Sequence, residues 1–92
     1  MEKEGGVIPG QEEYGVALAF VLINTEIGAE ESVVATLKNI EEVKEAYLAY
    51  GVYDIVAKIE ARDMETIKRV ISEKIRALKA IKTTTTMIAQ IS

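Results

Sequence analysis

One stretch of the chain is apolar without interruption and has the length of a β-strand: VALAFVLI, residues 16–23. Aliphatic and aromatic residues of this kind favour extended structure. Because alternate side chains of a strand point to opposite faces, one face of this strand carries Leu18, Phe20 and Leu22, and the opposite face is equally apolar. A strand with no polar face is typical of the centre of a sheet that is covered on both sides.

The hydrophobic pattern after this strand alternates between helical and extended periods. Residues 29–40 place apolar side chains three and four apart, with Glu30 and Glu31 in the first turn, where the helix dipole favours acidic residues. Asp63 is a good N-cap for a second helix. The expected elements are strand 16–23, helix 29–40, strands 43–50 and 53–60 with a tight turn at Gly51-Val52, helix 64–78 and strand 81–91.

This order of elements, β-α-β-β-α-β, predicts an α+β fold of the ferredoxin-like type. Two interlocked right-handed crossovers produce a four-stranded antiparallel sheet with both helices on one face. The other face of the sheet then exposes one apolar side of strand 16–23, which is more than a monomer usually leaves open. The pattern therefore predicts a dimer that packs these open sheet faces together.

The first 14 residues differ in composition from the rest of the chain, since they hold three of the six Gly and the only Pro. We expect residues 1–14 to form a flexible N-terminal tail and residues 15–92 to form one ligand-binding domain. The chain begins with no basic stretch leading into an apolar one, and run 16–23 is too short to span a membrane. We therefore expect a cytoplasmic protein.

The charge and the choice of residues exclude several classes of function. Acidic residues outnumber basic ones by 15 to 11, which argues against direct nucleic-acid binding, because such binding needs Lys and Arg to neutralise phosphates. The chain has no His and no Cys, so the commonest general base and the thiol nucleophile are missing. We expect no catalytic residue, no metal site and no cofactor.

The segment AYGVYD, residues 49–54, has two interpretations. In the first it is an ordinary hairpin turn, in which Gly51 supplies an unusual backbone conformation and Tyr50 and Tyr53 flank the turn. In the second, Asp54 has a functional partner, because Asp is a poor strand former and an apolar strand follows it directly. That partner would be a cation across a subunit boundary or the ammonium group of a ligand.

The four consecutive threonines at residues 83–86 are also open to two interpretations. Thr is β-branched and favours strands without any further role. A row of hydroxyls on a rigid strand is also able to bind a small polar ligand or a neighbouring subunit. Alternation places Thr84 and Thr86 on one face and Thr83 and Thr85 on the other, so we expect at most one pair to form a site.

Three segments together resemble the effector domain of Lrp/AsnC regulators, also called the RAM domain. They are the hairpin at residues 43–59 with its Gly-x-Tyr-Asp, the pair Ile75-Arg76, and residues 84–88 with their Thr-x-Thr. The resemblance covers residues 15–91. Full-length members of that family carry an N-terminal helix–turn–helix domain, and the segment before residue 15 is too short for one. The chain therefore resembles the stand-alone members of the family.

The resemblance implies an amino-acid sensor that acts in transcriptional regulation of amino-acid metabolism without a DNA-binding domain of its own. It implies homodimers formed through the open sheet faces, higher rings such as octamers or decamers, and co-assembly with full-length Lrp/AsnC proteins. Amino-acid effectors bind between dimers in that family, near the turn between the second and third strands. Carried over to this sequence, the ligand-binding residues are Tyr50, Gly51, Val52, Tyr53, Asp54, Thr84 and Thr86, with Thr83 and Thr85 as second choices.

Two other classes of function remain alternatives, because a fold does not decide a function. A small dimeric α+β-barrel enzyme of the monooxygenase type shares the fold and the dimer, but the His often found in that group is missing here. A purely structural oligomerisation domain is the second alternative. Binding of an amino acid favours the sensor, and turnover of a substrate favours the enzyme. The absence of both favours the structural oligomerisation domain.

Overall fold

The computed structural model describes residues 17–90, in which two α-helices pack on a sheet of four strands. The predicted tail at residues 1–14 lies outside the described residues, as do the first residue of the predicted strand 16–23 and the last of 81–91. Along the chain the elements are β1 (Ala17–Thr25), α1 (Glu30–Leu37), β2 (Val43–Leu48), β3 (Ile55–Ala61), α2 (Met64–Val70), the π-helical turn η2 (Ile71–Ile75) and β4 (Ile81–Gln90).

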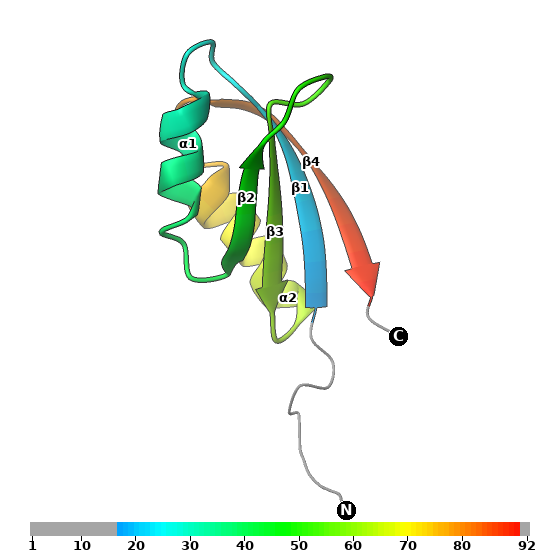
Figure 1. The fold of residues 1–92 in the computed structure, drawn as a ribbon. Helices are drawn as coiled ribbons and strands as arrows, with labels where there is room; N and C mark the ends of the chain where they lie inside the picture. Colours follow the sequence, from blue (N-terminus) through cyan, green and yellow to red (C-terminus); the bar gives the residue numbers. More distant parts are fainter. Residues whose placement is uncertain (1–16, 91–92) are drawn as a thin grey trace, which may run out of the picture.

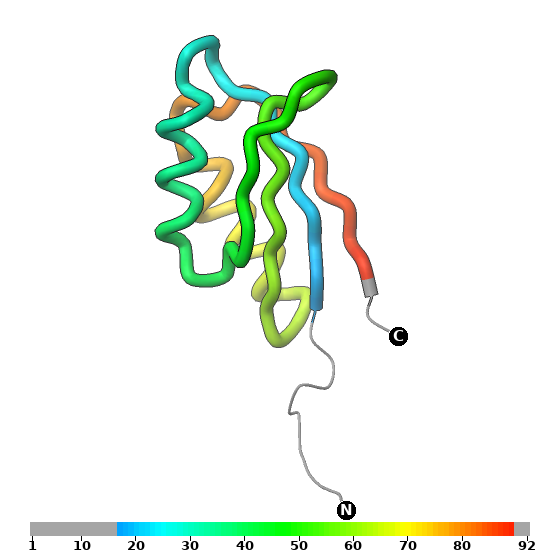
Figure 2. Tube along the Cα trace, viewed as in Figure 1, coloured from blue at the N-terminus to red at the C-terminus, as the bar shows by residue number. Residues whose placement is uncertain are grey.

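The strands follow the order β2-β3-β1-β4 across the sheet, and every neighbouring pair is antiparallel. Figure 1 shows both helices on the same side of the sheet. Each helix connects two strands that are separated by a third, so the two crossovers interlock, and the chain path can be followed in Figure 2. The predicted ferredoxin-like α+β fold, a four-stranded antiparallel sheet with two helices on one face, is confirmed.

β1 lies in the interior of the sheet, between β3 and β4, and both of its faces are apolar as predicted. Ala19, Val21 and Ile23 face the helices and are fully buried. The alternate residues Leu18, Phe20 and Leu22 lie on the other face, here called the open face, and are only partly buried. The structure thus assigns Val21 to the core and Leu18 to the open face, a choice that the sequence pattern left undecided.

The first helix is shorter than the predicted range of residues 29–40, because α1 ends at Leu37. The chain continues in tighter turns, in which the N–H of Asn39 donates to the Thr36 carbonyl and the N–H of Ile40 donates to the Leu37 carbonyl. Ile40 still packs against the core beyond the helix. The apolar spacing therefore extends further along the chain than the helix itself.

The second helix begins where the sequence predicts and changes its geometry after two turns. The carboxylate of Asp63 accepts a hydrogen bond of 2.7 Å from the N–H of Thr66, which confirms the predicted cap. This bond stabilises the charged form and lowers the pKa of Asp63. The predicted single helix 64–78 is wrong beyond Val70, because the N–H of Arg76 donates to the carbonyl of Ile71, five residues back, at 2.8 Å.

A pair of isoleucines tests the assignment of core and surface. Ile23 is fully buried and Ile27 is 98% exposed, four residues further along the chain. We predict that Ile23→Ala lowers the free energy of unfolding by about 2–5 kcal/mol, because it leaves a cavity in the core. The matched change Ile27→Ala should alter it by less than about 0.5 kcal/mol. Urea denaturation of both variants measures the difference, and equal losses would contradict the described burial.

Candidate functional site

The loop that joins β2 to β3 covers residues 49–54 and lies at the end of the sheet where β1 ends and β4 begins. The N–H of Ala49 donates to the Asp54 carbonyl at 2.8 Å, and the N–H of Asp54 donates to the Ile23 carbonyl at 2.9 Å. The bond between Ala49 and Asp54 closes a loop that is longer than a tight turn, and Asp54 also pairs with β1. The predicted tight turn at Gly51-Val52 is therefore wrong. Gly51 has a φ of 146°, a region that glycine adopts without strain.

Asp54 has a structural partner that neither interpretation of its sequence context included. Its Oδ2 accepts a hydrogen bond of 3.0 Å from the backbone N–H of Thr25, the last residue of β1. Thr25 is buried, so this N–H depends on a protein acceptor rather than on water. Asp54 thus closes the end of the interior strand and holds the β2–β3 loop against it.

A cavity of about 390 Å³, here called the turn pocket, lies between the β2–β3 loop and the start of α1. The ionisable side chains at its wall are three carboxylates and one tyrosine. The pocket therefore favours a cationic group next to a small apolar surface. Its lining residues are Gly28, Glu30, Glu31, Leu48, Ala49, Tyr50 and Asp54.

A second cavity of about 520 Å³, here called the β4 groove, lies between η2 and the first half of β4. Its charged side chains are both cationic, and three threonines line its β4 wall. The groove therefore offers hydrogen-bond donors to an anionic group. Its lining residues are Ile71, Arg76, Ile81, Lys82, Thr83, Thr84 and Thr86.

The register of β4 against β1 decides which threonines share a face. Thr84 and Thr86 lie opposite Ile23 and Val21, so they belong to the helix side of the sheet. Thr85 lies opposite Leu22 on the open face, where its Oγ1 accepts a hydrogen bond of 3.5 Å from the Tyr53 hydroxyl. The pair Thr84 and Thr86 therefore lines one groove, while Thr85 is directed to the other side.

The structure divides the predicted ligand-binding residues among four places instead of gathering them in one pocket. Because the turn pocket and the β4 groove share no lining residue, one protomer alone does not form the whole predicted site. Tyr50 and Asp54 line the turn pocket, Thr84 and Thr86 line the β4 groove, Gly51 and Val52 are exposed in the loop, and Tyr53 contacts Thr85 on the open face.

Four charged residues at these cavities were not predicted as site residues. Glu30 and Glu31 line the turn pocket, although their sequence position suggested only solvated charge at a helix start. The topology explains why Glu30 and Glu31 lie at the pocket. β1 and β2 run in the same direction, so the loops that follow them meet at one end of the sheet. Arg76 and Lys82 line the β4 groove. Arg76 depends on the π-helical turn, for which the apolar spacing gives no signal.

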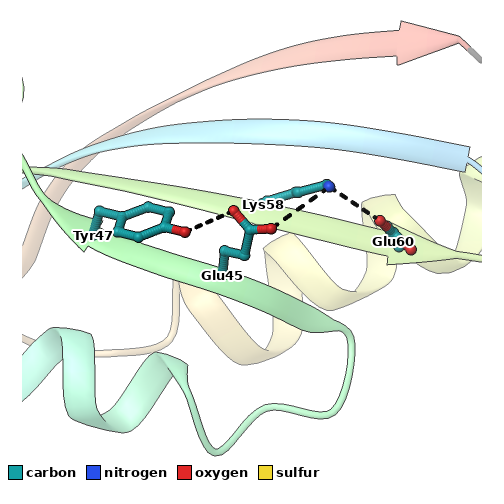
Figure 3. A network of polar contacts seen from close by, with 4 residues as sticks. All are labelled: Glu45, Tyr47, Lys58 and Glu60. Carbon is teal, nitrogen blue, oxygen red and sulfur yellow. Dashed lines mark hydrogen bonds and ion pairs between the residues drawn. The ribbon is translucent and has the colours of Figure 1, made fainter.

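The open face of the sheet is polar on its β2–β3 half, as Figure 3 shows. Lys58 Nζ lies 3.8 Å from Glu45 Oε2 and 3.4 Å from Glu60 Oε2. The hydroxyl of Tyr47 donates a hydrogen bond of 2.9 Å to Glu45 Oε1, and this carboxylate raises the pKa of Tyr47. The β1–β4 half has no charged residue among those described, since Phe20 lies opposite Met87 and Leu22 lies opposite Thr85 there. The open face therefore has an uncharged half and a charged half.

Two kinds of feature are missing from the part of the chain that the structure describes. Within residues 17–90, no helix has the length and apolar character needed to cross a membrane. The same residues contain no group of three or more His, Cys, Asp or Glu placed to hold a metal ion.

The sequence matches a known family over most of its length. A profile of the Lrp/AsnC ligand binding domain matches residues 18–90. The regulatory protein AsnC of Escherichia coli is 32% identical over 82 residues, a match that covers 89% of this chain and 54% of AsnC. The chain thus spans about half the length of this curated relative.

Solved structures with the same fold include one of similar length. A hypothetical protein from Pyrococcus horikoshii is 41% identical with a TM-score of 0.79, and the match covers 83% of this chain and 92% of that one. The Escherichia coli AsnC structure gives a TM-score of 0.79 at 30% identity, over 97% of this chain and 60% of AsnC. A Neisseria meningitidis transcriptional regulator in complex with L-Met shares the fold at 12% identity, with a TM-score of 0.78 over 99% of this chain and 60% of that one.

Two substitutions separate the structural role of Asp54 from its charge. Asp54→Ala removes the acceptor of the buried Thr25 N–H, and we predict a loss of about 1–3 kcal/mol in the free energy of unfolding. Asp54→Asn keeps an oxygen at that position and should retain most of this stability. Thermal and urea unfolding of the two variants measure the difference. If Asn is as costly as Ala, the hydrogen bond to Thr25 is not what Asp54 contributes.

Proposed function

Because this chain belongs to the Lrp/AsnC ligand-binding domain family, we propose that it is an amino-acid sensor that acts in transcriptional regulation. The curated relative AsnC is named a regulatory protein, which agrees with a function in regulation rather than catalysis. The acidic balance of the chain supports a role without direct DNA contact. In this proposal it acts in the cytoplasm, without a cofactor, and influences promoters through full-length relatives with which it assembles.

The turn pocket is the observation that carries the proposal. A free amino acid presents an ammonium group, and the pocket offers the carboxylates of Asp54, Glu30 and Glu31 to such a group. Gly51 in the adjacent loop has no side chain to block close approach of a ligand carboxylate to backbone N–H groups. A cavity of about 390 Å³ suits a small molecule. The L-Met complex of the Neisseria meningitidis regulator, which has the same fold, supports this choice of ligand.

We place the complete site at a junction between copies of the chain. Thr84 and Thr86 line a different cavity from Asp54 within one protomer, so their hydroxyls would reach a ligand in the turn pocket from a neighbouring copy. The partly buried side chains of Leu18, Phe20 and Leu22 on the open face support a dimer, and rings of such dimers would create the further junctions. In this proposal Tyr50, Val52 and Tyr53 belong to the wall of the site.

We predict that the protein binds at least one of the twenty free amino acids and that Asp54→Asn weakens this binding about tenfold to a hundredfold. A charge-assisted hydrogen bond contributes about 1.5–3 kcal/mol, and Asn keeps the contact to Thr25 while losing the charge. Isothermal titration calorimetry measures both proteins. Asp63→Asn is the matched control, because Asp63 is the only other aspartate and caps α2 instead.

Two outcomes would contradict this assignment. Absence of binding of all twenty amino acids at millimolar concentration would remove the sensor function. Equal affinity of wild type and Asp54→Asn would place the ligand elsewhere on the protein. Turnover of a substrate by the pure protein would instead favour the enzyme alternative.

The open face predicts at least a dimer in solution, with a mass of twice 10.1 kDa or more. We predict that Leu18→Asp breaks the dimer, because burial of an uncompensated charge costs about 3–5 kcal/mol. Light scattering at micromolar concentration measures the mass of each protein. The control Ile27→Asp, at a loop residue that is 98% exposed, should leave the dimer intact. A wild-type mass of one protomer would refute the dimer.

A further inference from the structure

The charges of the two cavities that form the proposed junction do not balance. The turn pocket has three carboxylates at its wall, those of Glu30, Glu31 and Asp54, and no described lysine or arginine lines it. None of the three takes part in an ion pair in the part of the chain that the structure describes. The β4 groove of a neighbouring copy would bring two cations, Arg76 and Lys82. One negative charge is therefore left over, and an amino acid without net charge does not neutralise it.

The surplus charge lies on the helix side of the turn pocket. Asp54 belongs to the loop side, where its Oδ2 accepts the hydrogen bond of 3.0 Å from the buried N–H of Thr25. Glu30 and Glu31 begin α1, and Figure 1 shows the loop before α1 at the same end of the sheet as the loop after β2. A helix start favours acidic side chains, which explains the pair in α1 but not the third carboxylate at the same cavity. The pocket thus offers two places for a cation, one at Asp54 and one at the start of α1.

Partial burial strengthens the repulsion among these carboxylates. Glu30 and Asp54 are only partly exposed. Charges in such positions are screened less by water and salt than charges on the open surface. A cation that enters the pocket relieves the repulsion, and each charge-assisted hydrogen bond that it forms is stronger than a bond between neutral groups. The pocket therefore favours a ligand with two cations over a ligand with one.

We infer that the ligand of the turn pocket is a basic amino acid, which carries a second cation at the end of its side chain. The inference rests on the proposed function and specifies the class of amino acid. A ligand at this pocket is supported independently of its charge by the cavity of about 390 Å³ and by the ligand-binding family to which the chain belongs. At neutral pH a basic amino acid has one net positive charge, which balances the surplus of the junction.

Each part of such a ligand has a partner in the junction. The α-ammonium pairs with Asp54, and the side-chain cation pairs with Glu30 and Glu31. The α-carboxylate meets the cations and hydroxyls of the neighbouring copy's β4 groove. Leu48 and Ala49 provide apolar surface for the aliphatic part of the side chain. The acidic start of α1 is therefore the element that selects among amino acids, whereas Asp54 holds the group that all of them share.

The test compares lysine with norleucine, which has the same carbon chain without the side-chain ammonium. Isothermal titration calorimetry of the full chain at one ionic strength measures both affinities. We expect lysine to bind at least tenfold more tightly, because it adds a charge-assisted hydrogen bond. Cadaverine, which is lysine without the carboxylate, should also bind at least tenfold more weakly than lysine. It distinguishes a basic amino acid from a diamine.

Glutamine substitutions at the start of α1 locate the side-chain cation. The double variant Glu30→Gln with Glu31→Gln should weaken lysine binding about tenfold or more and reduce the ratio of the lysine and norleucine affinities to about one. Asp54→Asn should instead weaken both ligands alike. Glu65→Gln is the matched control, because Glu65 lies in the first turn of α2, away from the turn pocket, and this variant should keep the ratio of wild type.

Three results would overturn the inference. They are equal binding of lysine and norleucine to wild type, cadaverine binding as tight as that of lysine, and a preference for lysine that persists in the double variant. If norleucine binds as well as lysine, the amino-acid sensor itself stands and only its selectivity for basic ligands is lost. If every amino acid fails to bind, the proposed function and the inference fall together. Circular dichroism checks the fold of the double variant, and the two single variants replace it if it is unfolded.

Discussion

The burial of β1 on both of its faces is the constraint on which the rest of the molecule depends. β1 pairs with β3 along one edge and with β4 along the other, so every backbone hydrogen bond of the sheet centre involves it or its neighbours. Its side chains Ala19, Val21 and Ile23 are covered by the helices of the same chain. The described residues form one helix layer, so no helix among them covers Leu18, Phe20 and Leu22, and a second copy covers these side chains in the proposed dimer. In that proposal assembly completes the core and is not an addition to it.

Local periodicity was sufficient to predict the order of the elements and the fold. The helical spacing around Val33 and Leu37, the cap at Asp63 and the apolar β1 all lie within short stretches of sequence, and the structure has each of them. The features that the pattern missed depend on contacts between distant residues. Asp54 bonds to Thr25, which is 29 positions away, and this contact lengthens the loop that looked like a tight turn. The π-helical turn keeps the four-residue spacing of Ile71 and Ile75, so no apolar period distinguishes it from an α-helix.

The candidate site could be predicted only in part, for a related reason. The pattern selected Tyr50, Asp54, Thr84 and Thr86 as side chains able to bind a ligand, and each of them lines a cavity. Which of them share a cavity is decided by strand register and by the face of each strand. The register and the face of each strand result from the pairing of β1 with β3 and β4, which joins residues far apart in the sequence. The acidic wall at Glu30 and Glu31 and the cation at Arg76 likewise follow from the three-dimensional arrangement.

The two edges of the sheet differ in how well they resist the addition of further strands. β2 carries Lys44 and Glu45 and an irregularity in its register, all of which discourage pairing with another chain. β4 has no charged residue from position 83 to position 90, it is rich in β-branched residues, and its outer edge is free in the described protomer. Such an edge is prone to aggregation. The single protomer is thus the species with this risk, and the proposed assembly would reduce the risk by lowering the protomer concentration through mass action.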